Sequence, residues 1–278
     1  MALILGLVAA LAWGLHDLLV RRISPGSNVL GQILAVFATA AVVLLALGGH
    51  EILTLTAGSA VLAASAGLAY VLAYVGMFRA FGLAPVRVVS PILAAYPLLT
   101  LLITAAQGQT VTLADWAAVA LVVAGVCLVA ALAEGDSGSP ASTRAALGWA
   151  ALGALGLATT FALGQAANVG QSAASAGAVT RLAAVLATMA LILWQRPSLD
   201  PVRQHWRTLL LMGVLDTVAL GLVMLAGGLA HAEYAAITAS LFGVVTILLA
   251  WRFLSEAVRP AQWLGVTLVF AGVIVLAV

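Results

Sequence analysis

The stretch Gly82–Leu102, GLAPVRVVSPILAAYPLLTLL, decides the fold because a related stretch recurs later in the same chain. It lies over Gly228–Leu248, GLAHAEYAAITASLFGVVTIL, and both copies begin with Gly-Leu-Ala. With a one-residue shift further on, DWAAVALVVAG from Asp115 lies over QWLGVTLVFAG from Gln262. The chain therefore contains an internal repeat, and both copies are long apolar runs.

The composition places these runs in a membrane. Of 278 residues, 64% are hydrophobic and 7% are charged, and the mean hydropathy is +1.20. A soluble domain carries about 25% charged residues, so this chain cannot cover a surface that faces water. The apolar runs are too long for a barrel, whose strands alternate apolar and polar residues. We therefore expect an all-α integral membrane protein.

Ten runs have about the length of 20 residues that a helix needs to cross the hydrocarbon core. They lie at 1–20, 29–48, 58–78, 86–106, 115–133, 146–166, 174–194, 207–228, 232–251 and 260–278.

The hydrophilic stretch EGDSGSPASTR divides the ten spans into two halves. We interpret residues 1–133 as a first five-helix repeat, 134–144 as a linker and 145–278 as a second repeat. Because each half has an odd number of spans, the second must enter the membrane from the opposite side. Inverted repeats of this kind are typical of transporters, in which a site between the halves opens to each side in turn.

Arginines gather on one side of the predicted spans. The residues at the odd-to-even connections are Arg21, Arg22, Arg79, Arg87, Arg144, Arg196, Arg203, Arg207, Arg252 and Arg259. Basic residues in short loops mark the cytoplasmic side, so we expect both termini to face outward. The net charge of +2 is a topology signal and does not indicate nucleic-acid binding.

Several motifs carry a family resemblance over the whole chain. They are Trp13-Gly14, the block GMFRAFGLAPVRVVSPILAAYPLLT from Gly76, and LSEAVRPAQWLGVTLVFAGVIVL from Leu254. Together with the duplication, they resemble the drug/metabolite transporter superfamily, in particular ten-helix members with paired EamA domains. The closest likeness within it is to bacterial exporters of aromatic amino acids. One departure is Gln109 in the first half where the second half has Glu256.

The resemblance implies a multi-pass protein of the bacterial cytoplasmic membrane that exports small metabolites without a cofactor or metal. We expect a monomer that works with the lipid bilayer and a small-molecule substrate. A carrier of another metabolite class is the alternative. Phosphorylated substrates fit less well, because their carriers need clustered cations and only one arginine, Arg181, lies deep in a predicted span. A membrane-embedded enzyme is a remote alternative, since neither HExxH nor GxSxG occurs.

Polar and aromatic side chains inside spans are candidate substrate contacts, because unpaired polar groups in hydrocarbon are costly. We expect them on helices 1, 3, 4, 6, 8 and 9, around one cavity. The candidates are Trp13, His16, Tyr70, Tyr74, Phe78, Ser90, Tyr96, Thr159, Gln165, Tyr234, Thr238 and Phe242. An aromatic stripe such as the one on helix 3 is also compatible with simple packing.

Charged residues in the spans are candidates for coupling transport to protons. They are Asp17, Asp216, Arg181 and Glu233. Asp216 is the best placed, because it lies well inside helix 8 and aligns with Tyr70 in the first repeat. The alternatives are that Asp216 holds neighbouring helices together, and that His16 and Asp17 pair with Arg21 or Arg22 near the interface.

Three residues are candidate hinge points. Pro91 and Pro97 lie inside the fourth span, where each removes a backbone donor, and Gly243 occupies the position in the second repeat that aligns with Pro97. Pro85 is expected at the turn that enters the same span, where its missing donor costs little. We therefore predict a kinked, moving fourth helix with Arg87 at its cytoplasmic end.

Overall fold

The computed structural model describes residues 1–25, 28–96, 98–99, 102, 105, 112–132, 140–226, 238–239 and 241–276. Over these residues the chain is helical and has no strand. The α-helices are α1 (Ala2–Ile23), α2 (Val29–Gly48), α3 (Ala57–Leu83), α4 (Val86–Ala94), α6 (Leu113–Ala131), α7 (Pro140–Asn168), α8 (Ala173–Gln195), α9 (Asp200–Ala226), α11 (Phe242–Phe253) and α12 (Pro260–Leu276). A 3-10 helix, η1 (Gly49–Thr54), joins α2 to α3.

Six of these helices, α1, α2, α3, α7, α8 and α9, are long and apolar enough to cross a membrane, and α6, α11 and α12 are shorter apolar helices. Their outer faces carry large apolar side chains, such as Leu186 and Leu193 on α8 and Leu210 on α9. Lipid is a suitable solvent for such faces, and helices satisfy their own backbone groups within it. The all-α membrane fold expected from the sequence is confirmed.

The helix predicted at 86–106 is interrupted. Helix α4 ends at Ala94, Ala95 lies in a turn, and the described residues Tyr96, Leu98 and Leu99 are again helical. Pro91 lies within α4 and lacks the backbone donor of an intrahelical hydrogen bond. Helix α7 begins at Pro140, inside the stretch 134–144 that the sequence predicts as the linker between the repeats, and proline suits the first turn of a helix. The start of the ninth predicted span and Pro97 lie outside the described residues.

Side-chain caps fix where two of the helices begin. The Asn28 side chain accepts a hydrogen bond from the backbone of Leu30 at the start of α2. Thr56 accepts one from the backbone of Ser59 at the start of α3. Each cap satisfies a donor that the first turn of a helix leaves without an intrahelical partner. Pro85 precedes α4 as its N-cap residue, as the sequence predicted.

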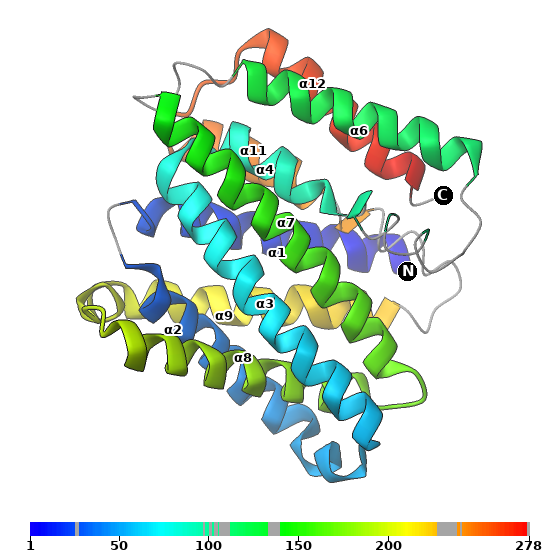
Figure 1. The fold of residues 1–278 in the computed structure, drawn as a ribbon, viewed down its shortest axis with the longest axis vertical. Coiled ribbons are helices and arrows are strands. Elements are labelled where there is room, and N and C mark those ends of the chain that lie inside the picture. Colours follow the sequence, from blue (N-terminus) through cyan, green and yellow to red (C-terminus); the bar gives the residue numbers. More distant parts are fainter. Residues whose placement is uncertain are drawn as a thin grey trace.

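The helix contacts recur when the two halves are exchanged. Helix α3 packs along α7 as α1 packs along α9, and α3 packs on α8 as α2 packs on α9 (Figure 1). Helix α1 contacts α11 as α7 contacts α4, while α2 packs on α8, α4 on α11 and α6 on α12. Two repeats related by a pseudo-two-fold axis produce this pattern. The exact bounds of the repeats stay a prediction.

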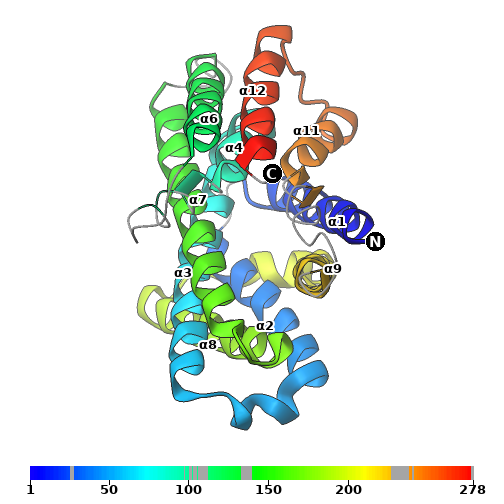
Figure 2. The same ribbon diagram turned by 90° about the vertical axis from the view of Figure 1, so that its right-hand side faces the viewer.

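Helices α6 and α12 form a separate pair at one end of the molecule, far from α2 and α8 at the other (Figures 1 and 2). Small residues let their backbones approach closely. A Cβ atom on Gly125 would lie 2.6 Å from the carbonyl oxygen of Gly265, and one on Gly272 would lie 2.7 Å from that of Ala118. Close contact through small residues is how membrane helices associate without a hydrophobic driving force.

At the arginine-bearing end, a charged cluster joins four segments. Arg21 at the end of α1 donates through Nε to Glu256 at 2.8 Å and through Nη1 to the carbonyl of Phe81 at 2.6 Å. The second oxygen of Glu256 accepts from the backbone of Val86 at 2.7 Å, which caps α4. Arg21 is therefore paired with Glu256, and the alternative that it pairs with Asp17 was wrong.

Candidate functional site

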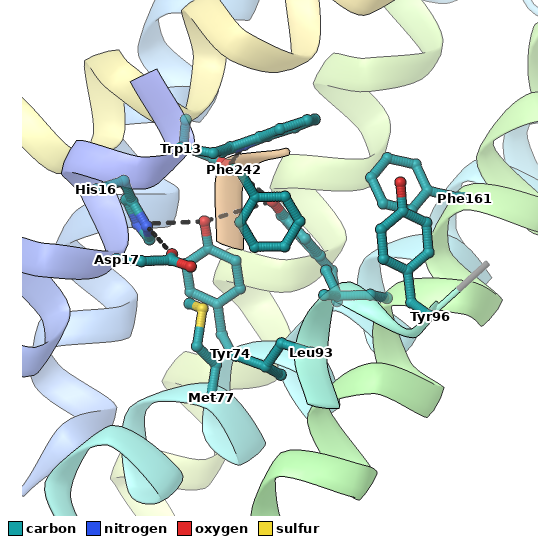
Figure 3. Close-up of a pocket in the computed structure, with 12 residues that line it drawn as sticks. Trp13, His16, Asp17, Tyr74, Met77, Leu93, Tyr96, Phe161 and Phe242 are labelled. Atoms are coloured by element: carbon teal, nitrogen blue, oxygen red, sulfur yellow. Dashed lines mark hydrogen bonds and ion pairs between the residues drawn. The ribbon is translucent and has the colours of Figure 1, made fainter. Parts of the chain in front are cut away.

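A central pocket lies between the two halves of the molecule (Figure 3). Its lining residues are Trp13, His16, Asp17, Tyr70, Tyr74, Met77, Leu93, Tyr96, Leu157, Phe161, Asp216 and Phe242. They come from α1, α3, α4 and the residues just after it, α7, α9 and α11. These are helices 1, 3, 4, 6, 8 and 9 of the predicted order, the same six that the sequence assigned to the cavity wall.

Asp216 accepts hydrogen bonds on both of its carboxylate oxygens at the pocket. Its Oδ1 accepts from the hydroxyl of Tyr70 at 2.7 Å and from Nε1 of Trp13 at 3.3 Å, while its Oδ2 accepts from Nη2 of Arg181 at 2.6 Å. Both side chains of the Arg181–Asp216 ion pair are 0% exposed. A buried carboxylate is tolerated when it is paired and its lone pairs are satisfied, and both conditions hold here.

Asp17 has a different environment in the same pocket. Its Oδ1 lies 3.0 Å from Nδ1 of His16, and Nε2 of the same ring lies 3.5 Å from the hydroxyl of Tyr74. Asp17 is buried, yet its Oδ2 has no hydrogen-bond partner among the described residues. The pocket thus contains one satisfied carboxylate and one with an acceptor to spare.

Aromatic rings form the apolar part of the wall. Trp13 meets Phe161 and Phe242 edge to face, with ring centroids 6.2 Å apart in each pair. Tyr96 stacks on Phe161 at 5.0 Å. Figure 3 shows Tyr96 and Phe161 together on one side and His16 and Asp17 on the other. Such a wall offers both flat faces and ring edges to an apolar ligand.

A second layer of rings holds the two pocket tyrosines in place. Phe37 of α2 lies 5.3 Å from the ring of Tyr70 and 4.6 Å from that of Tyr74. Phe78 stacks on Tyr74 at 5.8 Å. Phe37 and Phe78 are both fully buried and do not line the pocket. Phe78, which the sequence suggested as a substrate contact, therefore supports the wall from behind.

Four further candidates lie away from the central pocket. Gln165 is exposed, and the hydroxyl of Thr159 donates to the carbonyl one turn earlier in α7. Thr238 donates to a carbonyl near the start of α1, and Ser90 is buried within α4 with no partner for its hydroxyl oxygen among the described residues. Their placement gives no support to direct substrate contact. Sequence periodicity could not show this, because it does not say which neighbour a helix face meets.

Three predicted residues, Glu233, Tyr234 and Pro97, lie outside the described residues. The other two hinge candidates lie close together. A Cβ atom on Gly243 would be 2.8 Å from the ring of Phe270 and 3.2 Å from Cβ of Ala94, at the end of the helix that contains Pro91. Gly243 thus lets α11 approach α4, and the hinge role of both residues stays a prediction.

The sequence reading missed Met77, Leu93, Leu157 and Phe161 among the lining residues. Leu157 and Phe161 are four residues apart on α7, a spacing that places them on one helix face. That signal was available, but apolar residues in an apolar span do not stand out. Among the described residues, no three His, Cys, Asp or Glu side chains come together as a metal site would need.

A family model for the EamA-like transporter family matches residues 1–131 and again residues 144–278. The chain belongs to the EamA-like transporter family. Both matches fall on the halves that meet at the central pocket. As a member of this family, the protein is a membrane transporter of small molecules.

Structural comparison shows that the fold itself is known. One similar solved structure, described only as the crystal structure of a protein, has a TM-score of 0.66 and 20% sequence identity. The match covers 99% of this chain and 95% of the other chain, so the two share a fold from end to end. No curated protein matches the sequence.

Proposed function

We propose that this EamA-like protein exports aromatic or other bulky amino acids, or closely related metabolites, by alternating access around the central pocket. The observation that carries the proposal is an enclosed aromatic wall with a carboxylate oxygen of Asp17 left without a donor among the described residues. Small-molecule sites are mostly apolar, with a few polar groups that fix the orientation of the ligand.

An ammonium group suits the free oxygen of Asp17. An ammonium ion carries donors and no acceptor, and a charge-assisted hydrogen bond is about twice as strong as a neutral one. The rings of Trp13, Phe161 and Phe242 then contact the apolar part of the same molecule. A primary amine joined to a bulky apolar group matches both the free oxygen of Asp17 and the aromatic part of the pocket.

The cluster of Arg21, Glu256, Phe81 and Val86 supports alternating access. It ties the ends of α1, α3 and α4 to the connection between α11 and α12. Opening the pocket toward this end requires these hydrogen bonds to break. By the arginine rule this end faces the cytoplasm of a bacterial cell, so we propose that the described conformation is closed on the side where an exporter takes up its substrate.

Counterflow in liposomes tests the proposed function. The purified full-length chain is reconstituted into vesicles loaded with unlabelled phenylalanine, tryptophan, leucine or glucose 6-phosphate, and uptake of radiolabelled phenylalanine is measured. We expect the amino acids to drive uptake and the phosphorylated sugar to leave it at the level of empty vesicles. Absence of counterflow with every amino acid, from protein that is folded by gel filtration, would overturn the proposal.

A further inference from the structure

A second pocket opens directly beside the central one. This side pocket lies between α7 and α8 and shares Tyr70 and Phe161 with the central pocket. Its other described lining residues are Thr160, Gly164, Asn168, Ala173, Ala176, Gly177, Thr180, Arg181 and Leu220. The side pocket therefore runs from the buried Arg181 toward the connection between α7 and α8, away from the arginine-bearing end.

Arg181 is the only arginine or lysine among the described residues that line either pocket. It is fully buried, and its guanidinium lies 4.2 Å from the ring centroid of Tyr70. Its Nη2 donates to Asp216, but Nε and Nη1 have no hydrogen-bond partner among the described residues. Buried polar groups are nearly always hydrogen-bonded, so donors left over in a cavity indicate a missing acceptor.

The hydroxyls around the side pocket do not supply that acceptor: the hydroxyl of Tyr70 lies 3.5 Å from Nη2, the nitrogen already bonded to Asp216. Thr180 donates to the carbonyls of Ala63 and Ala176, each at 3.0 Å, and Thr160 donates to a carbonyl one turn earlier at 2.7 Å. Both hydroxyls thus serve their own helix packing. A ligand acceptor in the side pocket would meet the guanidinium of Arg181 as its main polar partner.

We propose that the side pocket binds the carboxylate of the transported molecule through Arg181. A guanidinium presents its N–H donors as a planar fork that matches the two oxygens of a carboxylate. One arginine, already paired with Asp216, suits a single negative charge better than the two charges of a phosphate. This inference rests on the proposed function and narrows its substrate class to zwitterions with a free carboxylate.

Asp216 lines the central pocket and is paired with Arg181, which lines the side pocket, so a ligand on Arg181 affects this ion pair. Nη2 of Arg181 takes part in either fork of the guanidinium, so a carboxylate that binds both oxygens shares this nitrogen with Asp216. Asp216 keeps its hydrogen bonds from Tyr70 and Trp13, and the ammonium group of the same ligand pairs with the free oxygen of Asp17. Because the ligand is a zwitterion, the total charge in the buried site does not change when it binds.

The test compares ligands that differ at the carboxylate. Binding of L-phenylalanine and of L-phenylalaninamide to the purified full-length protein is measured by isothermal titration calorimetry. A charge-assisted bond in a buried site is worth about a 10- to 100-fold change in affinity, so we expect the amide to bind weaker by that factor. Equal affinities would overturn the side-pocket inference while leaving the proposed function intact. Absence of binding by both compounds would overturn the proposed function and this inference with it.

Variants of Arg181 test whether this residue causes the difference in affinity between phenylalanine and its amide. Because Arg181→Gln leaves Asp216 buried without its partner, the double variant Arg181→Gln/Asp216→Asn, which removes both charges, is used for the comparison. We expect phenylalanine and its amide to bind this variant with similar affinity, and Arg181→Lys to keep a reduced preference because a point charge replaces the fork. Arg203→Gln, an exposed arginine at the start of α9, is the matched control and should keep the full preference. A full carboxylate preference in the double variant would contradict the inference.

Discussion

At the scale of single residues, the two buried carboxylates of the central pocket have different roles. Asp216 has donors on both oxygens, from Tyr70 and Trp13 on one side and Arg181 on the other. Asp17 has one oxygen beside His16 and one with no donor among the described residues. The sequence favoured Asp216 for proton coupling because of its depth, but its bonding suits a fixed charge. We therefore propose Asp17 as the proton carrier.

This comparison predicts how a pH gradient acts on transport. The groups facing Asp17 are His16 on its own helix, Tyr74 on α3 and Asp216 on α9. We expect phenylalanine flux in liposomes to change severalfold when a gradient of about two pH units is imposed, and Asp17→Asn to remove that dependence while Asp216→Asn lowers flux at every pH. The exposed Asp200→Asn serves as the control. Loss of the pH dependence in Asp216→Asn alone would contradict the assignment.

At the scale of helices, the sequence predicted most of the helices. It did not predict the helix ends that depend on single residues, such as the prolines. Hydropathy located the spans of α1, α2, α3 and α8 to within a few residues. It could not show that the helix containing Pro91 ends at Ala94, because an apolar run is compatible with lipid whether or not its hydrogen bonding continues. The close packing of α6 on α12 rests on small residues such as Gly125 and Gly272.

The pairing of α6 with α12 makes a prediction about stability. A Cβ atom on Gly125 would lie 2.6 Å from a backbone oxygen and 2.7 Å from the backbone nitrogen of Val269, so the helices must move apart to accept a side chain. We expect Gly125→Val to lower stability by about 1–3 kcal/mol, the usual cost of overpacking. Thermal unfolding of the purified protein in detergent measures this change. Gly148→Val is the control, since no atom lies within 4 Å of a Cβ at that position. Equal unfolding temperatures for both variants would refute the close contact.

At the scale of the whole molecule, the internal repeat explains why a single site forms. Tyr70 and Asp216 occupy aligned positions in the two halves, and the hydroxyl of one donates to the carboxylate of the other at 2.7 Å. Equivalent positions can touch only near the axis that relates the halves. The sequence supplied the alignment and the polar character of both positions. It could not supply Arg181 as their third partner, because nothing in a one-dimensional pattern says which way an arginine points.

The two repeats differ at the position that closes the arginine-bearing end of the molecule, and this difference yields the last prediction. Glu256 of the second half holds Arg21 and the backbone of Val86, whereas the aligned position in the first half is Gln109, which carries no charge. Removing the charge should therefore favour opening at this end alone.

We expect Glu256→Gln to raise, severalfold, the rate at which a charged maleimide reacts with Leu93→Cys in the central pocket, in a Cys127→Ala background. The reagent is added from the arginine side of oriented vesicles. Exchanging the charges in Arg21→Glu/Glu256→Arg should restore slow labelling in part, since the ion pair re-forms with reversed sign while the backbone of Val86 loses its acceptor and the carbonyl of Phe81 its donor. An unchanged labelling rate in Glu256→Gln would mean that the cluster holds the helix ends together without controlling access to the pocket.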